Sequence, residues 1–389
     1  MRIKHVHAWW VRIPIEAARQ HRSDFGQVTT FDAAILRIET DDGLVGWGEG
    51  KNAAGSAGSY GALVHMLNHE VGPQLIGLQA GDISMIWEML YNGVRHEKAA
   101  IAGHTMPQLA RRGLTTAAIS AVDIALWDIL GKSLNVPVWK LLGGRKLDRL
   151  PAYASGGWAS ADKIGEQLHS YVSAGGFKAV KMRIGAMDGR PHVSAARVRA
   201  AREALGPDID LMVDAHGTYT VSEARRFANL VADCDLAWFE EPLTADDKPG
   251  MAELRKAIPI PIATGESEAT RYAFRDLAVL KSADIFQPDP AFCGGISEAV
   301  KIGTIASAFN LRFAPHLWAG APCFFAGLHI CAASASSFII EYSLGANPMI
   351  HDLVTETIEA KDGMIAIPET PGLGFTVSER FLEAHAQRT

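Results

Sequence analysis

The sequence predicts an α/β fold in which a barrel of parallel strands follows a smaller α+β module. From about residue 150 to residue 343, short apolar runs alternate with helical patterns. An ionisable residue ends most of these runs, and the later ones are spaced by 23 to 27 residues. This period is the length of one parallel βα unit, and eight such strands close into a (β/α)₈ barrel or a close variant. The first part of the chain lacks the repeat.

The N-terminal module begins with two strand patterns. Residues 3–13 and 33–46 read as strands, and Asp41-Asp42-Gly43 is typical of a hairpin turn. Helical patterns follow at about 60–72, 81–94 and 114–133. We therefore expect an α+β module ahead of the barrel.

The barrel elements follow in order. The first strand is predicted at 149–154, and the second ends in Lys181-Met182-Arg183. The later strands end in single ionisable residues, which are Asp214, Glu240, Glu266, Asp289, His316 and Glu341. Helical patterns lie between strands, at 193–205, 222–231, 270–280, 296–309 and 320–335. Because the carboxyl ends of barrel strands form the reaction face, these residues are candidates for a site. A doubly wound open sheet is the alternative, but no Gly-rich phosphate turn follows the first strand.

Three of these strand ends carry carboxylates at equal spacing. Asp214, Glu240 and Glu266 lie 26 residues apart. Ionised carboxylates at the ends of buried strands need a partner charge. All-oxygen ligation favours one Mg²⁺, or Mn²⁺, over zinc or copper. The sequence therefore predicts a metal-dependent enzyme.

Composition excludes several other classes of protein. The 389 residues are enough for two domains, and the net charge of −6 comes without a basic stripe, so we expect no nucleic acid partner. We find no apolar run of about 20 residues and no signal peptide, and so expect no membrane partner. The four cysteines lack metal-ligand spacing and indicate a reducing compartment. We predict a cytoplasmic enzyme.

These residues, in this order, resemble the enolase superfamily and its mandelate racemase-like subgroup. The resemblance includes residues 117–128 and 136–144 and covers nearly the whole chain. It implies a modified (β/α)₇β barrel at 121–345, an α+β capping domain at 1–120, and a segment at 346–389 that returns to the capping domain. It also implies Mg²⁺ ligation by Asp214, Glu240 and Glu266. Asp289 with His316 matches the His-Asp dyad of the subgroup, and Glu341 matches its electrophilic carboxylic acid. We also expect a homo-oligomer.

The second barrel strand departs from the subgroup's Lys-x-Lys motif. Lys181 and Arg183 should both face the site, because positions i and i+2 of a strand point to the same side. Arginine stays protonated and is a poor base, so Arg183 is better suited to hold a carboxylate. Lys181 could donate in the same way, or act as a base with a lowered pKa. A racemase needs a base on each face. A dehydratase needs one base and an acid, and one group can serve as both in a syn elimination, so the departure favours dehydration.

Further candidates surround this set. His216, two residues after Asp214, resembles the histidine that helps expel the leaving group in some acid-sugar dehydratases; a supporting hydrogen bond is the alternative role. Arg22 and Asp24 lie in one loop of the capping domain, and Lys51 and Asn52 open another. They are expected to bind substrate, and they suit a polyhydroxylated acid unless they belong to solvated loops.

The sequence thus favours a Mg²⁺-dependent acid-sugar dehydratase that abstracts the proton α to a carboxylate and yields a 2-keto-3-deoxy acid. A racemase or epimerase that uses Lys181 and His316 is the alternative. A cycloisomerase is a further isomerase option, but the His-Asp pair argues against it. A barrel that only binds metal and a sugar acid is the non-catalytic option. The sequence does not identify the sugar acid.

Overall fold

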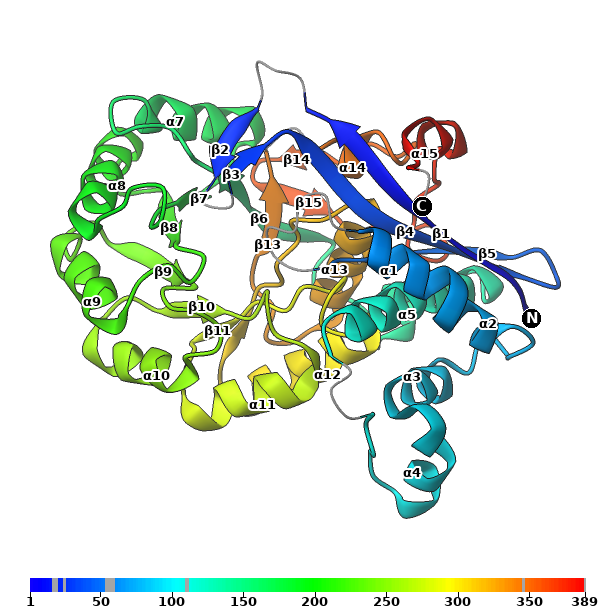
Figure 1. Cartoon of the computed structure of the whole chain (residues 1–389). Coiled ribbons are helices and arrows are strands. Elements are labelled where there is room, and N and C mark those ends of the chain that lie inside the picture. The colour runs from blue at the N-terminus through cyan, green and yellow to red at the C-terminus, as the bar shows by residue number, and fades with distance from the viewer. Residues whose placement is uncertain (16–19, 24–25, 53–59, 109–111, 345–346, 388–389) are drawn as a thin grey trace.

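The computed structural model describes residues 1–15, 20–23, 26–52, 60–108, 112–344 and 347–387. Figure 1 shows a ring of strands and helices on one side and an N-terminal sheet with its helices on the other. The apolar residues of the first strands pack on the first helices, and the remaining large core joins the barrel strands to their surrounding helices.

Within the described residues, eight strands form the barrel. They are β6 (Arg149–Gly156), β7 (Ala179–Arg183), β8 (Asp210–Asp214), β9 (Leu236–Glu240), β10 (Ile262–Thr264), β11 (Ile285–Phe286), β12 (Arg312–Phe313) and β13 (Ile340–Ser343). Strands β6 to β12 pair in order as parallel neighbours, and β13 pairs with the other edge of β6. An isolated parallel bridge between Phe313 and Ser337 connects β12 with the residues that lead into β13.

One helix stands between each pair of consecutive barrel strands in the described chain. These helices are α7 (Ile164–Gly175), α8 (Pro191–Leu205), α9 (Val221–Leu230), α10 (Lys248–Ala257), α11 (Thr270–Leu280), α12 (Gly295–Ala308) and α13 (Ala321–Ala333). Figure 1 shows α7 to α11 around the outside of the strands. The expected (β/α)₇β barrel is confirmed.

The N-terminal module is an antiparallel sheet covered by helices. Strand β4 (Thr30–Thr40) lies between β1 (Ile3–Pro14) and β5 (Val45–Gly50), and the predicted turn at 41–43 joins β4 to β5. A small hairpin pairs β2 (His21–Ser23) with β3 (Gly26–Val28). The helices are α1 (Gly61–Met66), η2 (Leu67–Val71), α2 (Gly72–Leu75), α3 (Ile83–Asn92), η3 (Gly93–Arg95), α4 (His96–Ala102), α5 (Leu114–Ser133) and α6 (Val138–Leu141).

Helix α5 corrects one expectation from the sequence. It is 20 residues long and apolar enough to cross a membrane by length and composition alone. However, 83% of its apolar window is buried inside the protein, where it packs on β5 and α12. Its apolar character is therefore explained by its place in the core.

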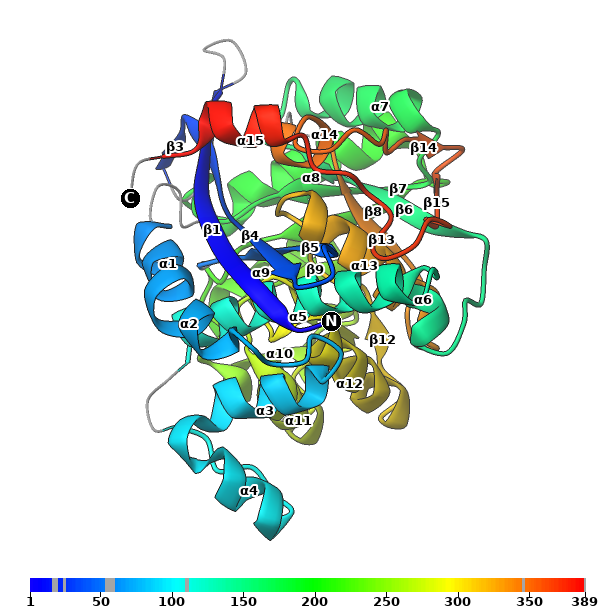
Figure 2. The ribbon, with the colours of Figure 1, turned by 90° about the vertical axis from the view of Figure 1, so that its right-hand side faces the viewer.

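The C-terminal segment contacts both parts of the molecule. Strand β15 (Met364–Ala366) pairs with β14 (Ala360–Lys361) and with β6 of the barrel. Helix α15 (Glu379–His385) lies across β1, as Figure 2 shows, while α14 (Pro348–His351) packs near α13. The division into three domains stays a proposal. A cut at residue 120 would fall inside α5, so we propose the boundary between α6 and β6.

A layer of apolar side chains fills the barrel below the polar strand ends. It comprises Tyr153, Ala179, Met212, Trp238, Ala263, Ile285 and Ala314. Side chains two positions apart on a strand point to the same side. The residues two positions beyond this layer therefore include Lys181, Asp214, Glu240, Gln287 and His316. The apolar layer forms a floor, and the polar residues lie directly on it.

Strand β5 lies flush against α5 because alternate residues are glycine. A Cβ at Gly46, Gly48 or Gly50 would lie 2.2, 1.9 or 2.8 Å from the carbonyl oxygens of three alanines one helical turn apart, Ala125, Ala121 and Ala117. The intervening residues, Trp47, Glu49 and then Lys51, face the opposite way. The glycines thus allow the strand to aim Glu49 and Lys51 at the barrel.

This packing predicts a large effect of one methyl group. Gly48→Ala should destabilise the protein by about 1–3 kcal/mol, because no room exists between β5 and the α5 backbone. Thermal unfolding would measure it. Gly61→Ala is the control, since its Cβ would meet Trp10 only at an ordinary 3.5 Å. Equal melting temperatures for Gly48→Ala and wild type would contradict the proposed contact.

Candidate active site

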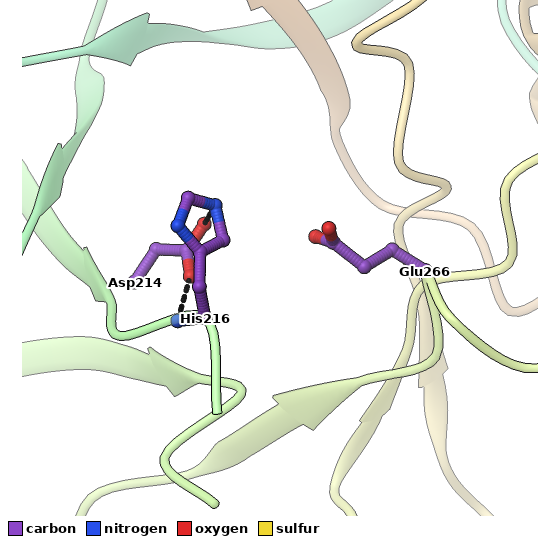
Figure 3. Close-up of side chains that lie close together, drawn as sticks. All are labelled: Asp214, His216 and Glu266. Carbon is purple, nitrogen blue, oxygen red and sulfur yellow. Dashed lines mark hydrogen bonds and ion pairs between the residues drawn. The ribbon is translucent and has the colours of Figure 1, made fainter. Parts of the chain in front are cut away.

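Two carboxylates face each other at the carboxyl end of the barrel. Asp214 ends β8, and Glu266 follows β10. In Figure 3 their side chains extend toward one another, and His216 lies beside Asp214. One possible ligand atom from each of these three residues lies within 4.8 Å of the other two. Glu266 Oε2 is buried and accepts no hydrogen bond from the described residues. The arrangement suits a cation bound between β8 and β10.

Glu240 lies between these two on β9, where its Cα pairs with that of Asp214. Its Oε1 forms an ion pair with Lys181 Nζ. Its Oε2 accepts hydrogen bonds from Trp238 Nε1 at 2.9 Å and from Gln287 Nε2 at 2.7 Å. Gln287 was not predicted from the sequence as a site residue, although its position two residues after the inward-facing Ile285 could have identified it. The structure thus places Glu240 beside the pair, with both oxygens already engaged.

The charges of this region do not balance. Asp214, Glu240, Glu266, Asp289 and Glu341 are each at most 4% exposed. The described permanent cations that pair with them are Lys51, Lys181 and Arg183. Five carboxylates against three cations leave two negative charges, which equal the charge of one divalent ion. Oxygen donors with this surplus fit Mg²⁺ better than a soft metal.

His316 and Asp289 form a buried pair at the ends of β12 and β11. His316 Nδ1 donates to Asp289 Oδ2 at 2.8 Å, since the carboxylate only accepts. His316 Nε2 therefore faces the site, 3.5 Å from Glu266 Oε2. Burial alone would raise the pKa of Asp289, but Lys51 and His316 outweigh it and hold the pKa at about 2. An ionised Asp289 fixes the tautomer of His316, which leaves Nε2 able to accept a proton.

Lys181 lies fully buried among carboxylates. Besides Glu240, its Nζ contacts Glu341 Oε1 at 3.1 Å and Asp214 Oδ2 at 3.8 Å. The other oxygen of Glu341 accepts the Leu317 N–H at 2.7 Å. Burial would raise the pKa of Glu341, but Lys181 and His316 more than offset it and keep that pKa below its ordinary value. An ionised Glu341 can only accept hydrogen bonds. To act as the electrophilic acid that the resemblance implied, Glu341 would have to be protonated, and the adjacent ammonium group of Lys181 disfavours that protonation.

Arg183 contacts both Asp214 and His216. Its Nη1 forms an ion pair with Asp214 Oδ2 and lies 2.6 Å from His216 Nε2. Because arginine only donates, His216 Nε2 accepts and the imidazole proton is on Nδ1. The guanidinium also lies 5.7 Å from the ring centroid of Trp318, which packs edge-on against Trp158. As expected, the side chains of Lys181 and Arg183 both face the strand-end carboxylates.

The candidates of the N-terminal module separate into three groups. Lys51 is only 8% exposed, and its Nζ donates to Asp289 Oδ2 at 3.1 Å. Asn52 follows it and is partly exposed. Asp24 lies outside the described residues, and Arg22 is described only through its backbone in β2.

Glu49 is a further buried residue at this edge that was not predicted from the sequence. It accepts the backbone N–H groups of Gly320 and Cys323 at the start of α13, and burial raises its pKa to about 7.

Two models of known protein families match most of this chain. A family model described as "Mandelate racemase / muconate lactonizing enzyme, N-terminal domain" matches residues 5–143. A second model, "Enolase C-terminal domain-like", matches residues 163–381. The two matches together cover the N-terminal module and nearly all of the barrel.

Individual relatives align end to end. D-galactarolactone cycloisomerase of Agrobacterium fabrum is 34% identical over 387 residues, which are 94% of this chain and 96% of that protein. Arabinonate dehydratase of Saccharolobus solfataricus is 34% identical over 357 residues, covering 91% and 90%. A racemase from Streptomyces coelicolor A3(2), solved with bound magnesium, superposes with a TM-score of 0.85 at 30% identity, covering 99% of this chain and 100% of that one. The chain therefore belongs to the enolase superfamily, in its mandelate racemase and muconate lactonizing enzyme branch, and is an enzyme of the dehydratase and racemase class.

Proposed function

We propose that the protein is a Mg²⁺-dependent dehydratase that converts an aldonate or aldarate to a 2-keto-3-deoxy acid. One observation carries this choice. His316 is held by Asp289 with Nε2 facing the site, whereas both cations of β7 are engaged by carboxylates. The site therefore offers one oriented base, which is what an elimination needs.

His316 would begin the reaction. Its Nε2 accepts the proton from the carbon next to the substrate carboxylate, and the ionised Asp289 stabilises the imidazolium that forms. The product of this step carries a second negative charge on the substrate carboxylate. Mg²⁺ bound by Asp214, Glu240 and Glu266 would supply Lewis-acid stabilisation of that charge. Arg183 would hold a substrate oxygen beside Asp214, because its guanidinium donates several hydrogen bonds.

The β-hydroxyl must leave with a proton. In a syn elimination the protonated His316 returns the proton it has just accepted, so no second acid is required. His216, which lies beside Asp214, is the other candidate for the acid. Its Nε2 accepts from Arg183, so an acid role would use the Nδ1 proton. His216→Asn would separate the two routes: it should leave α-proton exchange intact and slow only water loss if His216 is the acid.

A cycloisomerase, which the His-Asp pair was expected to disfavour, is the second candidate because the chain is 34% identical to D-galactarolactone cycloisomerase. The same single base would serve. If the β-oxygen belongs to a lactone ring, its departure opens the ring and the product keeps the mass of the substrate. A dehydratase product is lighter by one water. The mass of the product therefore distinguishes these reactions.

A racemase or epimerase is the alternative that needs a second base, at Lys181. Its nitrogen contacts Glu240 and Glu341, which does not suit it to abstract a proton from carbon. Solvent deuterium entering either enantiomer without loss of water would support racemisation. Arg183→Lys, which restores the Lys-x-Lys motif, should increase α-proton exchange from the face of the substrate next to β7. If wild type already exchanges the α-proton from both faces, Arg183 does not prevent racemisation.

A panel of aldonates, aldarates and their lactones tests the proposal. The Mg²⁺-loaded protein should form a 2-keto product from at least one open-chain acid, detected as its semicarbazone and by mass. The absence of turnover on every member of the panel would count against the dehydratase.

We also propose that Asn52, Arg22 and Asp24 contact the substrate, that the protein is a homo-oligomer and that it works in the cytoplasm.

A further inference from the structure

The end of β5 brings the N-terminal module into contact with the base. The backbone N–H of Lys51 donates to Ala291 O at 2.9 Å, in the loop that follows Asp289. Its Nζ lies 3.1 Å from Asp289 Oδ2 and 3.5 Å from His316 Nδ1. A lysine from one domain is therefore fixed at both its backbone and its side chain against the dyad of the other domain.

Asp289 depends on these contacts for its orientation. Its Oδ1 accepts from Ala291 N at 2.9 Å and from Cys323 Sγ at 3.4 Å. Its Oδ2 accepts from His316 Nδ1 and Lys51 Nζ. Of these four donors in the described structure, Lys51 alone carries a permanent charge. Asp289 is fully buried, so removing this cation would leave most of its negative charge without a compensating charge.

Other residues of the module hold the same loop. Trp87 Nε1 donates to Gly294 O at 2.8 Å, Gly294 N donates to Ser120 Oγ at 2.9 Å, and Asp123 Oδ1 accepts from Ser297 N at 3.0 Å. Glu49, two residues before Lys51, accepts from Gly320 N at 2.7 Å after the strand end that carries His316. The segments that follow both members of the dyad are thus attached to the N-terminal module.

We propose that Lys51 is a positioning residue for proton abstraction: it holds the Asp289 carboxylate so that Oδ2 meets His316 Nδ1. The N-terminal module then does more than cover the barrel, because it contributes a charge to the base. This inference rests on the proposed role of His316 as the base. It replaces the expectation that Lys51 binds substrate from an open loop.

Kinetics of three variants test the proposal. Lys51→Met should lower kcat roughly 10–100-fold with little change in KM, because a misplaced base slows the chemical step. Lys51→Arg keeps the charge and should be clearly more active. Lys132→Met is the matched control: Lys132 holds Asp128 and the Val45 carbonyl at the other end of β5, but does not reach the dyad. It should lower stability and leave kcat unchanged. A raised KM alone in Lys51→Met would identify a substrate-binding residue and overturn the proposal.

A second measurement needs no substrate. In protein with ¹⁵N-labelled histidine, the Nδ1 proton of His316 is the resonance that disappears in His316→Asn. It should be protected from solvent exchange in wild type and Lys51→Arg, and exchange faster in Lys51→Met. Unchanged protection in a stably folded Lys51→Met would overturn the proposal. Because this readout is independent of turnover, it separates a failure of the inference from a failure of the proposed dehydratase.

Discussion

His316→Asn should abolish proton abstraction while leaving the protein folded and the metal bound. Asparagine is close in size and still reaches Asp289, but it cannot accept a proton. We expect the rate of α-proton exchange to fall by at least the roughly 10²–10⁴-fold typical of a general base. No concentration of Mg²⁺ should restore it, because the lost group is not a proposed ligand. Solvent deuterium exchange followed by NMR measures the effect directly.

A second buried histidine provides the control. His329 is also fully buried, and burial lowers its pKa to about 4. Its Nδ1 accepts from Trp139 N at 3.1 Å, and its Nε2 donates to Leu373 O at 2.9 Å. His329→Gln should destabilise the protein by about 1–3 kcal/mol, the cost of unsatisfied buried groups, with exchange retained. If His316→Asn behaves like this control, His316 is structural and the base must be sought at His216 or Lys181.

Substitution of a proposed metal ligand should impair the enzyme in a different way from His316→Asn. Asp214→Asn or Glu266→Gln removes one negative charge from the region that carries two in excess. We expect the Mg²⁺ affinity to fall by more than the roughly 10–100-fold that outer-shell substitutions cost. High Mg²⁺ should then rescue part of the activity. Calorimetric titration with Mg²⁺ or Mn²⁺ measures the affinity without any substrate.

Glu268→Gln is the matched control for the metal ligands. Glu268 lies two residues after Glu266 and is also buried, but its carboxylate forms an ion pair with Lys248 on α10. This substitution should leave the Mg²⁺ affinity unchanged. If Glu268→Gln and Glu266→Gln lose equal Mg²⁺ affinity, the affinity depends on the total negative charge near the site and not on particular ligands. The proposal that Asp214, Glu240 and Glu266 form the metal site would then fail.

The sequence by itself determined the barrel and the edge at which the candidate site residues gather. Apolar runs at one βα period pair as parallel strands, and the ionisable residues at their carboxyl ends then meet at one edge. Alternation along each strand placed Lys181 and Arg183 on the same side. These features are local or periodic, so they can be read from the residues without coordinates. Helix α5 was predicted at 114–133, but its long apolar character was not recognised, because a 3.6-residue pattern indicates a helix without showing how much of its surface is covered.

Only the tertiary structure decided how the side chains are paired. Glu49 and Lys51 are about 240 residues away in sequence from Asp289, and no local pattern records that β5 rests flush on α5 and faces the dyad. In the same way, equal spacing made the three carboxylates look equivalent, but their partners differ. Glu240 is engaged by Lys181, Trp238 and Gln287, and Asp214 by Arg183 and the His216 N–H. Glu266 Oε2 accepts no hydrogen bond from the described residues. The physical reason is that strand periodicity fixes the direction of a side chain, whereas its partners depend on which elements pack above it.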